Sequence, residues 1–326
     1  MKQLILGVVL GLLPLSAVAR QTLEECVQEH LKTADPTVTV GELQSDCQVE
    51  LSLPSKPKSS ALQRLAMERR TEWNPFVITP HKQNYILPAT YMEQPNSAPY
   101  AGLNEGQLQH AEIKMQISLK VPLAQSDMLV AGDSLYFGFT MQSYWQFYNH
   151  SLSAPFRETD YQPEVFYTIP LFLHEGAEGS ALRLGLEHQS NGRSQPMSRS
   201  WNRVYTQWFY ARHNYLVSFR PWYRIPEKRK DDPSRASGDD NPDIDDYMGY
   251  FELQGVWDYN RYEVSALIRN NMRSDNRGAI ELGFSFPLWG RLKGYAQYFN
   301  GYGESLIDYN YRMERFGLGV LLTDLL

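Results

Sequence analysis

Alternation of apolar and polar side chains recurs along most of this chain and limits what it can fold into. Between residues 112 and 121, for example, every second residue is apolar, and the residues between them include Glu112, Lys114 and Lys120. Successive side chains of a β-strand point to opposite faces, so this pattern predicts a strand with one apolar and one polar face. We expect about twelve such strands, at residues 84–92, 112–123, 134–148, 162–172, 180–190, 201–213, 215–225, 247–258, 260–270, 278–288, 291–300 and 311–322.

A soluble β-sandwich would alternate as well, and the polar faces distinguish the two folds. Here they carry mixed charges, such as Glu112 with Lys114, as expected of a narrow barrel interior tied by internal pairs. The mean hydropathy of −0.46 is compatible with a membrane barrel, because lipid-facing and lumen-facing residues alternate. An aromatic content of 13% suits the aromatic girdles of such barrels. The sequence therefore predicts an all-β fold, a transmembrane antiparallel β-barrel of about twelve strands with a small N-terminal extension.

The first residues have the features of a secretory signal. Lys2 supplies an early positive charge, an apolar run extends from Leu4 to Val18, and Ala17-Val18-Ala19 forms a small-x-small cleavage site. This run is too short for a membrane anchor, which needs roughly 20 apolar residues. We therefore predict a signal peptide at residues 1–19 and export of the remaining chain.

Both cysteines of the chain, Cys26 and Cys47, follow this signal. In an exported chain such a pair is expected to form a disulfide, whereas two lone cysteines would make a poor metal site. Residues 52–60 are rich in Pro, Ser and Lys, which is typical of a linker. The sequence thus predicts a periplasmic extension at 20–74 and an outer-membrane barrel domain at 75–326.

The strand at 180–190 ends in a chemically unusual pair. His188 and Ser190 continue the face that the leucines of this strand occupy, so both should point outward near the extracellular end if the N-terminus is periplasmic. A serine hydroxyl becomes a nucleophile when a neighbouring base takes its proton, and His188 is within reach. Asn202, on the outward face of the returning strand, could orient the imidazole. The alternative is an ordinary loop serine beside an interfacial histidine.

Two longer motifs include these residues, at 187–194 and 198–203. Together with 153–159, 301–310 and Asn74-Pro75-Phe76, they resemble the signature of the outer membrane phospholipase A family. The resemblance runs from about residue 74 to the end of the chain and leaves out the cysteine-bearing extension.

The resemblance implies a twelve-stranded barrel in a bacterial outer membrane with the N-terminus in the periplasm. It also implies calcium-dependent hydrolysis of phospholipid acyl esters, of the A1 and A2 type and including lysophospholipids. Ser190 would be the nucleophile, His188 the base and Asn202 the residue that orients it. The amide of Gly192 would contribute to the oxyanion hole.

By the same resemblance, Ca²⁺ would be held by the Arg193 carbonyl, the Ser198 hydroxyl and the Ser153 carbonyl, the last from the other subunit of a homodimer. Some members carry an acidic residue for an additional calcium site where this chain has Gln195. Members also place a lipid-facing glutamine in the dimer interface, where this chain has Met141. We therefore expect dimerisation to rest on apolar packing.

Other interpretations remain open from the sequence. The charged segment Glu227–Asp246 lacks the ordered spacing of a calcium loop, so we expect a solvated loop there rather than a metal site. A net charge of −6 gives no reason to expect a nucleic-acid partner.

The alternatives to a phospholipase are a non-catalytic barrel, either a porin or a structural protein, and a lipid A deacylase.

Overall fold

The computed structural model describes residues 23–32, 39–41, 43–44, 47, 59–100, 108–124, 127–174, 177–232, 234–235, 237–290 and 292–326. The chain divides into two compact units, Met1–Lys56 and Pro57–Leu326. The expected signal peptide at 1–19 lies outside the described residues and stays a prediction.

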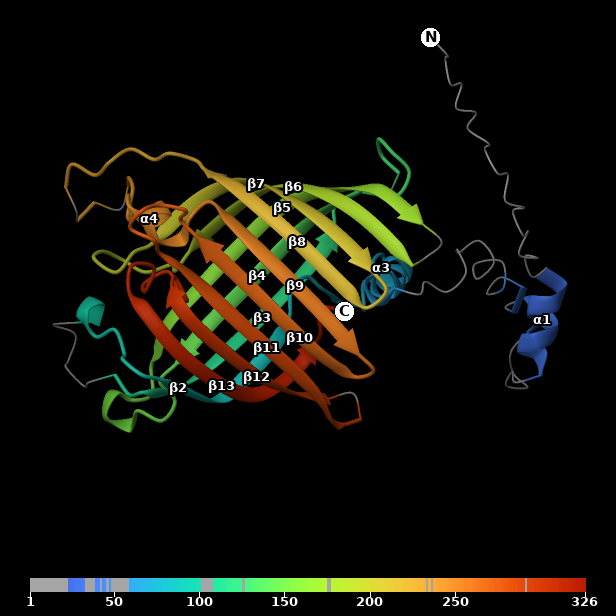
Figure 1. Ribbon diagram of the computed structural model, residues 1–326, viewed down its shortest axis with the longest axis horizontal. Coiled ribbons are helices and arrows are strands. Elements are labelled where there is room, and N and C mark those ends of the chain that lie inside the picture. The colour runs from blue at the N-terminus through green and yellow to red at the C-terminus, as the bar shows by residue number, and fades with distance from the viewer. Residues whose placement is uncertain are drawn as a thin grey trace, which may run out of the picture. The chain divides into compact units, whose positions relative to one another are not determined.

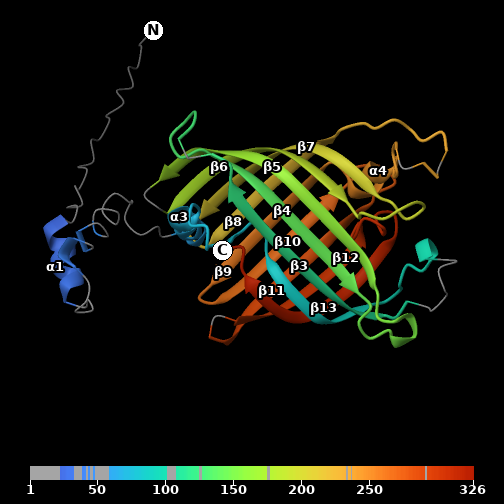
Figure 2. The same ribbon diagram turned by 180° about the vertical axis from the view of Figure 1, so that it is seen from behind.

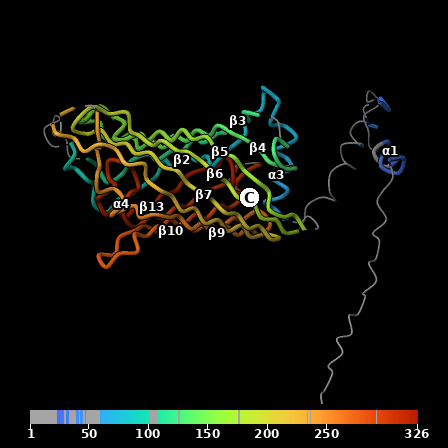
Figure 3. The backbone as a smooth tube through the Cα atoms, turned by 90° about the horizontal axis from the view of Figure 1, so that it is seen from above, coloured from blue at the N-terminus to red at the C-terminus, as the bar shows by residue number. Residues whose placement is uncertain are grey.

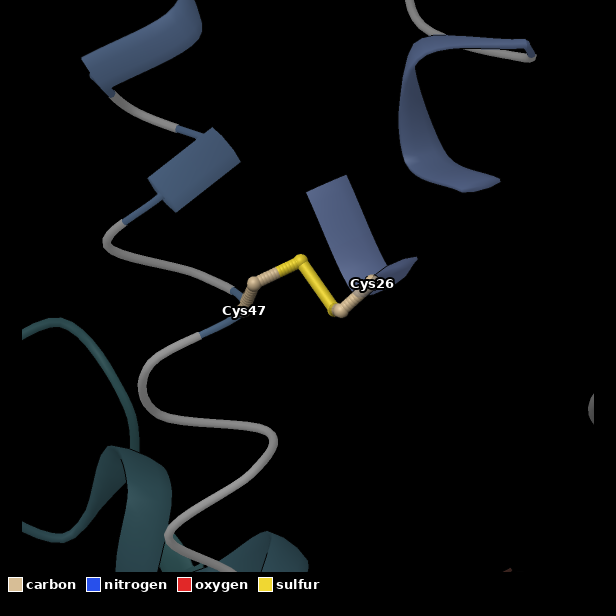
Figure 4. Close-up of a disulfide and its surroundings, with 2 residues drawn as sticks. All are labelled: Cys26 and Cys47. Carbon is tan, nitrogen blue, oxygen red and sulfur yellow. A yellow bond between two sulfur atoms is a disulfide. The ribbon is translucent and has the colours of Figure 1, made fainter. Parts of the chain in front are cut away.

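In the first unit, helix α1 (Leu23–Leu31) carries Cys26, which forms a disulfide with Cys47 (Figure 4). The S–S distance is 2.10 Å and the two Cα atoms are 5.8 Å apart. Val27 and Leu43 are buried against the disulfide, so the four side chains form a small core.

In the second unit, strands β2 to β13 form a closed antiparallel barrel (Figures 1 and 2). Each strand pairs with its neighbours in sequence, and β13 pairs with β2 to close the sheet. The bounds are β2 (Asn84–Met92), β3 (Ala111–Pro122), β4 (Ser134–Trp145), β5 (Phe156–His174), β6 (Glu178–Ser190), β7 (Ser200–Arg212), β8 (Tyr215–Arg224), β9 (Phe251–Tyr259), β10 (Tyr262–Asn270), β11 (Gly278–Trp289), β12 (Leu292–Tyr302) and β13 (Arg312–Thr323). The predicted twelve-stranded barrel is confirmed; the short strand β1 (Thr79–Pro80), which pairs with the end of β3, is additional.

The barrel interior is charged and internally paired. Glu112 and Lys114 are fully buried, whereas Ile117, on the opposite face of β3, is 46% exposed. Lys114 Nζ lies 3.1 Å from Glu304 Oε1, and the Arg157 guanidinium binds both carboxylate oxygens of Glu112 at 3.0 Å. The alternation seen in the sequence therefore corresponds to the lumen-facing and lipid-facing sides of the barrel wall.

Helix α3 (Ser60–Thr71) packs against one end of the barrel (Figure 1). Ser60 Oγ donates to Asp258 Oδ1 at 2.9 Å, and Lys120 Nζ pairs with Glu68 Oε2 at 2.7 Å. From the sequence, residues 60–71 are expected in the N-terminal extension. In the structure they belong to the barrel unit, because their charged side chains find partners on the strands.

The two ends of the barrel differ in their connections. Helix α4 (Ile244–Met248) lies at the end opposite α3 (Figure 3). At the α4 end the connections include 191–199 and the long segment 225–250, whereas at the α3 end β7 and β8 are joined by only two residues. Two short 3-10 helices, η1 (Ala98–Tyr100) and η2 (His150–Leu152), lie in connections at the α4 end. None of the helices in the described residues is long and apolar enough to cross a membrane.

Candidate active site

The end of β6 places its side chains on alternate faces of the barrel wall. His188 is directly opposite Asn202 of β7, and Ser190 is opposite Ser200. Glu187, which precedes His188 and therefore points to the other face, is buried and forms an ion pair with Arg203. His188 is exposed and Ser190 half-buried, so both belong to the outer face, as the alternation predicted.

The structure brings His188 and Asn202 into contact. His188 Nδ1 lies 2.8 Å from Asn202 Oδ1, which is a normal hydrogen-bond distance. If Nδ1 carries the proton, Nε2 is free to accept one, as a general base requires. Within the described part of the chain the Ser190 hydroxyl makes no hydrogen bond, so the hydrogen bond from Ser190 to the imidazole is not formed in this structure.

An apolar wall surrounds this pair. Leu186 precedes His188 on the same face and is 57% exposed, and Val204 is its cross-strand partner. Tyr161 is exposed opposite Ser190, and Tyr223 is exposed beside Val204. Large exposed apolar side chains on a barrel exterior are the surface that lipid tails contact. An acyl chain lying along this wall would reach the hydroxyl and the imidazole from the side.

The turn after β6 is tightly fixed. Asn191 Nδ2 donates to Glu158 Oε1 at 2.8 Å and to the Met197 carbonyl at 2.9 Å, and its Oδ1 accepts from the Arg199 amide. Gly192 follows with φ +64°, a conformation that other residues adopt only at a cost. Among the described residues, the Gly192 N–H donates to no acceptor, so it is available to a developing oxyanion.

Two of the three expected calcium ligands, Arg193 and Ser198, lie in this turn. The Ser198 hydroxyl donates to Asp240 Oδ2 at 2.6 Å, and the Gln195 amide donates to Asp240 Oδ1 at 2.6 Å. Lys230 also forms an ion pair with Asp240. Hydroxyl, carbonyl and carboxylate oxygens are the ligands that Ca²⁺ prefers, so the oxygens of Ser198 and Asp240 have the right chemistry, with the Asp240 carboxylate now paired to Lys230. No group of three or more His, Cys, Asp or Glu residues that could hold a metal ion occurs in the described ranges.

Ser153 lies in the connection between β4 and β5, and Met141 lies on β4. Ser153 ends η2 in the left-handed conformation, with φ 58°. Met141 lies on the outer face of β4, opposite Tyr161 of β5, which in turn is opposite Ser190. The neighbouring Gln142 points inward and donates to the Tyr85 hydroxyl at 3.1 Å. Met141 and Ser190 thus share one cross-strand row.

The expectation of a solvated loop holds for only part of the charged segment 227–246. Its described residues between 228 and 237 are mostly exposed, whereas the residues from 238 onward are mostly buried or half-buried. Arg224 Nη2 pairs with Asp239 Oδ1 at 2.6 Å, and Asn241 Oδ1 accepts from the Ser200 amide at 3.1 Å. Burial raises the pKa of the Asp245 carboxyl, although Arg224 opposes this rise. The segment folds back over the end of β7 because its carboxylates and amides find partners there.

Two residues of this segment therefore join the candidate site and were missed in the sequence. Asp240 contacts Ser198, and Glu227 Oε1 accepts a hydrogen bond from Asn202 Nδ2 at 3.0 Å. Neither residue stands at a spacing from its partner that a strand or helix pattern would reveal.

Comparison with known proteins identifies the family of this chain. The phospholipase A1 family model matches residues 62–322. A relative from Neisseria meningitidis serogroup B is 41% identical over 75% of this chain, and the chain spans 65% of that relative's length. The phospholipase A1 of Escherichia coli K12 is 37% identical, over 77% of this chain and 83% of the relative.

Solved structures of outer membrane phospholipase A have the same fold. An active-site mutant of the Escherichia coli protein superposes with a TM-score of 0.72 at 34% identity, over 82% of this chain and all of the other. The calcium-bound dimer of the Salmonella typhi protein gives a TM-score of 0.70 at 35% identity, over 84% of this chain and all of the other. With a matching family model over most of its length and these relatives, the chain belongs to the phospholipase A1 family.

Proposed function

We propose that this protein is a calcium-dependent outer-membrane phospholipase that hydrolyses acyl esters of phospholipids at the A1 and A2 positions and of lysophospholipids. The observation that carries the proposal is the 2.8 Å contact between His188 and Asn202 on the outer face, two residues from Ser190. Membership of the phospholipase A1 family supports the substrate class. The apolar wall around Leu186 supports lateral access from the bilayer.

In the proposed reaction, Ser190 Oγ attacks the ester carbonyl while His188 Nε2 takes the hydroxyl proton. The tetrahedral intermediate collapses as His188 returns that proton to the departing lysophospholipid oxygen, leaving an acyl group on Ser190. Water then attacks the acyl-enzyme, with His188 again as base, and releases the fatty acid. Asn202 holds the imidazole in the orientation that both halves require.

Negative charge develops on the carbonyl oxygen in each half-reaction. The free N–H of Gly192 would donate to it, because the turn is already fixed by Asn191. Arg193 and Ser198 would hold Ca²⁺ through their oxygens, with Asp240 close enough to contribute a charged one. When bound, the metal would add electrostatic stabilisation of the oxyanion.

A homodimer is part of the proposal. The Salmonella typhi relative is a calcium-bound dimer. In this chain, Met141 lies in the same cross-strand row as Ser190, so a partner seated on that face would border the nucleophile. Ser153 of the partner subunit would then supply the remaining carbonyl ligand. With Met141 at this position, apolar packing would hold the dimer.

The fold and the family support an outer-membrane location, and we propose the orientation of the barrel as well. An outer-membrane barrel with periplasmic termini would have its short turns and α3 on the periplasmic side and the site near the outer leaflet. We propose residues 1–19 as the cleaved signal. The disulfide-bonded segment that follows would lie in the periplasm, where disulfides persist.

The test is fatty acid release by the purified protein from phospholipid–detergent micelles, with Ca²⁺ and with excess chelator. We expect turnover with Ca²⁺, a loss of more than about tenfold with chelator, and recovery when Ca²⁺ is returned. Lipid A is offered as the alternative substrate, and liposomes loaded with a small solute are tested for leakage. Release from lipid A alone would indicate a deacylase, and leakage without any fatty acid release would indicate a porin.

A further inference from the structure

Glu227 contacts the proposed triad, yet the mechanism above does not use it. Asn202 faces two partners through the two ends of one amide group. Its Oδ1 lies 2.8 Å from His188 Nδ1, and its Nδ2 donates to Glu227 Oε1 at 3.0 Å. His188, Asn202 and Glu227 therefore form one continuous line of hydrogen bonds.

Glu227 is held in this place by the backbone around it. The residue follows β8 by three positions, and the Ile225 amide donates to the Asn202 carbonyl at 2.8 Å, so the chain stays beside β7 after the strand ends. Arg224, the last residue of β8, is anchored to Asp239 on the far side of the loop. Glu227 itself is half-buried. The backbone hydrogen bond of Ile225 and the ion pair of Arg224 therefore hold this part of the chain so that the Glu227 carboxylate lies beside Asn202.

The chemistry of the two groups sets the direction of the hydrogen bonds. The two ends of an amide have nearly the same shape, so an asparagine can turn either way unless a partner decides. An ionised carboxylate only accepts hydrogen bonds and therefore requires the NH₂ end of Asn202. The amide oxygen is then left facing His188, whose Nδ1 must carry the proton. This is the tautomer whose Nε2 can take the proton of Ser190.

We propose that Glu227 is a positioning residue: by fixing the amide orientation of Asn202 it fixes the tautomer of His188. The inference rests on the proposed function, because it assigns Glu227 a part in the same triad. An asparagine carries no charge of its own. The arrangement places the carboxylate at the loop end of the strands, where its desolvation costs less than on the lipid-facing wall.

The test measures how much Glu227→Ala changes kcat on phospholipid micelles containing Ca²⁺. The change is measured in the otherwise unchanged protein and in the Asn202→Ala variant. In the otherwise unchanged protein we expect kcat to fall about tenfold, with KM changed less than about twofold, because orientation of the base is lost rather than binding. In the Asn202→Ala background we expect Glu227→Ala to change kcat less than about twofold, because the path from Glu227 to His188 is already cut.

Two further variants sharpen the result. Glu227→Gln can present either its amide oxygen or its NH₂ group to Asn202, so it no longer decides the direction of that amide, and we expect its kcat to lie between those of the alanine variant and the unchanged protein. Asp232→Ala removes a carboxylate from the same loop, one whose hydrogen bonds are to Ser234, and should leave kcat unchanged. Heat-modifiable migration on gels confirms that each barrel is folded.

Equal losses from Glu227→Ala in both backgrounds would overturn the inference, as would no loss in either. A glutamine variant as fast as the unchanged protein would also overturn it, because an acceptor-only group would then not be needed beside Asn202. The proposed function is tested separately by Ser190→Ala. If that variant stays active, the triad itself is wrong. If it is inactive while Glu227→Ala is unimpaired, only the role of Glu227 fails.

Discussion

Ser190→Ala is expected to lower kcat for phospholipid hydrolysis by about 10⁴-fold or more, because the acyl-enzyme can no longer form. What remains would come from substrate binding and oxyanion stabilisation alone. KM should change little, since the hydroxyl contributes little to binding the acyl chain. The measurement is initial-rate fatty acid release from micelles over a range of phospholipid concentrations.

The matched control is Ser200→Ala. Ser200 is directly opposite Ser190 on the neighbouring strand and is also half-buried, so the substitution makes the same chemical change one strand away. We expect it to keep kcat within about threefold, as for a change that leaves the reacting groups in place. Comparable losses in the two variants would mean that Ser190→Ala acts by disturbing the strand pair and not by removing a nucleophile.

Arg157→Met should reduce the free energy of unfolding of the barrel by about 3–5 kcal/mol, as expected when one member of a buried ion pair is removed. Arg157 binds both oxygens of Glu112 at 3.0 Å, and its Nη1 lies 2.7 Å from Asp308 Oδ2. All three side chains are buried. Methionine fills a similar volume but leaves two buried carboxylates short of a cation. Urea-dependent unfolding in lipid vesicles, followed by tryptophan fluorescence, measures the change.

An exposed arginine provides the comparison. Arg261 lies in the two-residue turn between β9 and β10 and donates to the Gly290 carbonyl. Arg261→Met should cost less than about 0.5 kcal/mol, the usual range for a surface substitution. A loss below about 1 kcal/mol for Arg157→Met would contradict this expectation and would show that Arg315, which lies 2.8 Å from Glu112, is a sufficient partner for that carboxylate.

The strands could be predicted from the sequence because their signal is local. The alternation that puts Ile117 outside and Lys114 inside is visible within a single segment, and it also fixes the outward parity of His188 and Asn202. The ion pairs inside the barrel could not be predicted in the same way. Lys114 pairs with Glu304, 190 positions later, and no spacing rule connects them.

The elements that were missed depend on such distant partners. Helix α3 has a weak apolar stripe of its own and is held by contacts such as Glu68 with Lys120 on β3. Glu227 and Asp240 reach Asn202 and Ser198 only because the 225–250 connection folds back over β7. In the sequence this segment is a run of charges, and a run of charges is ordinarily solvated. Its order comes from tertiary contacts.

The most direct measurement is covalent labelling of the purified protein by a long-chain alkyl phosphonofluoridate in mixed micelles, followed by mass spectrometry of the peptides. A serine activated by a neighbouring base attacks phosphorus, expels fluoride and becomes stably phosphonylated. We predict one adduct, on Ser190, formed in step with loss of hydrolysis and absent from His188→Asn. An adduct on another residue, or full hydrolysis by protein labelled at Ser190, would contradict the account.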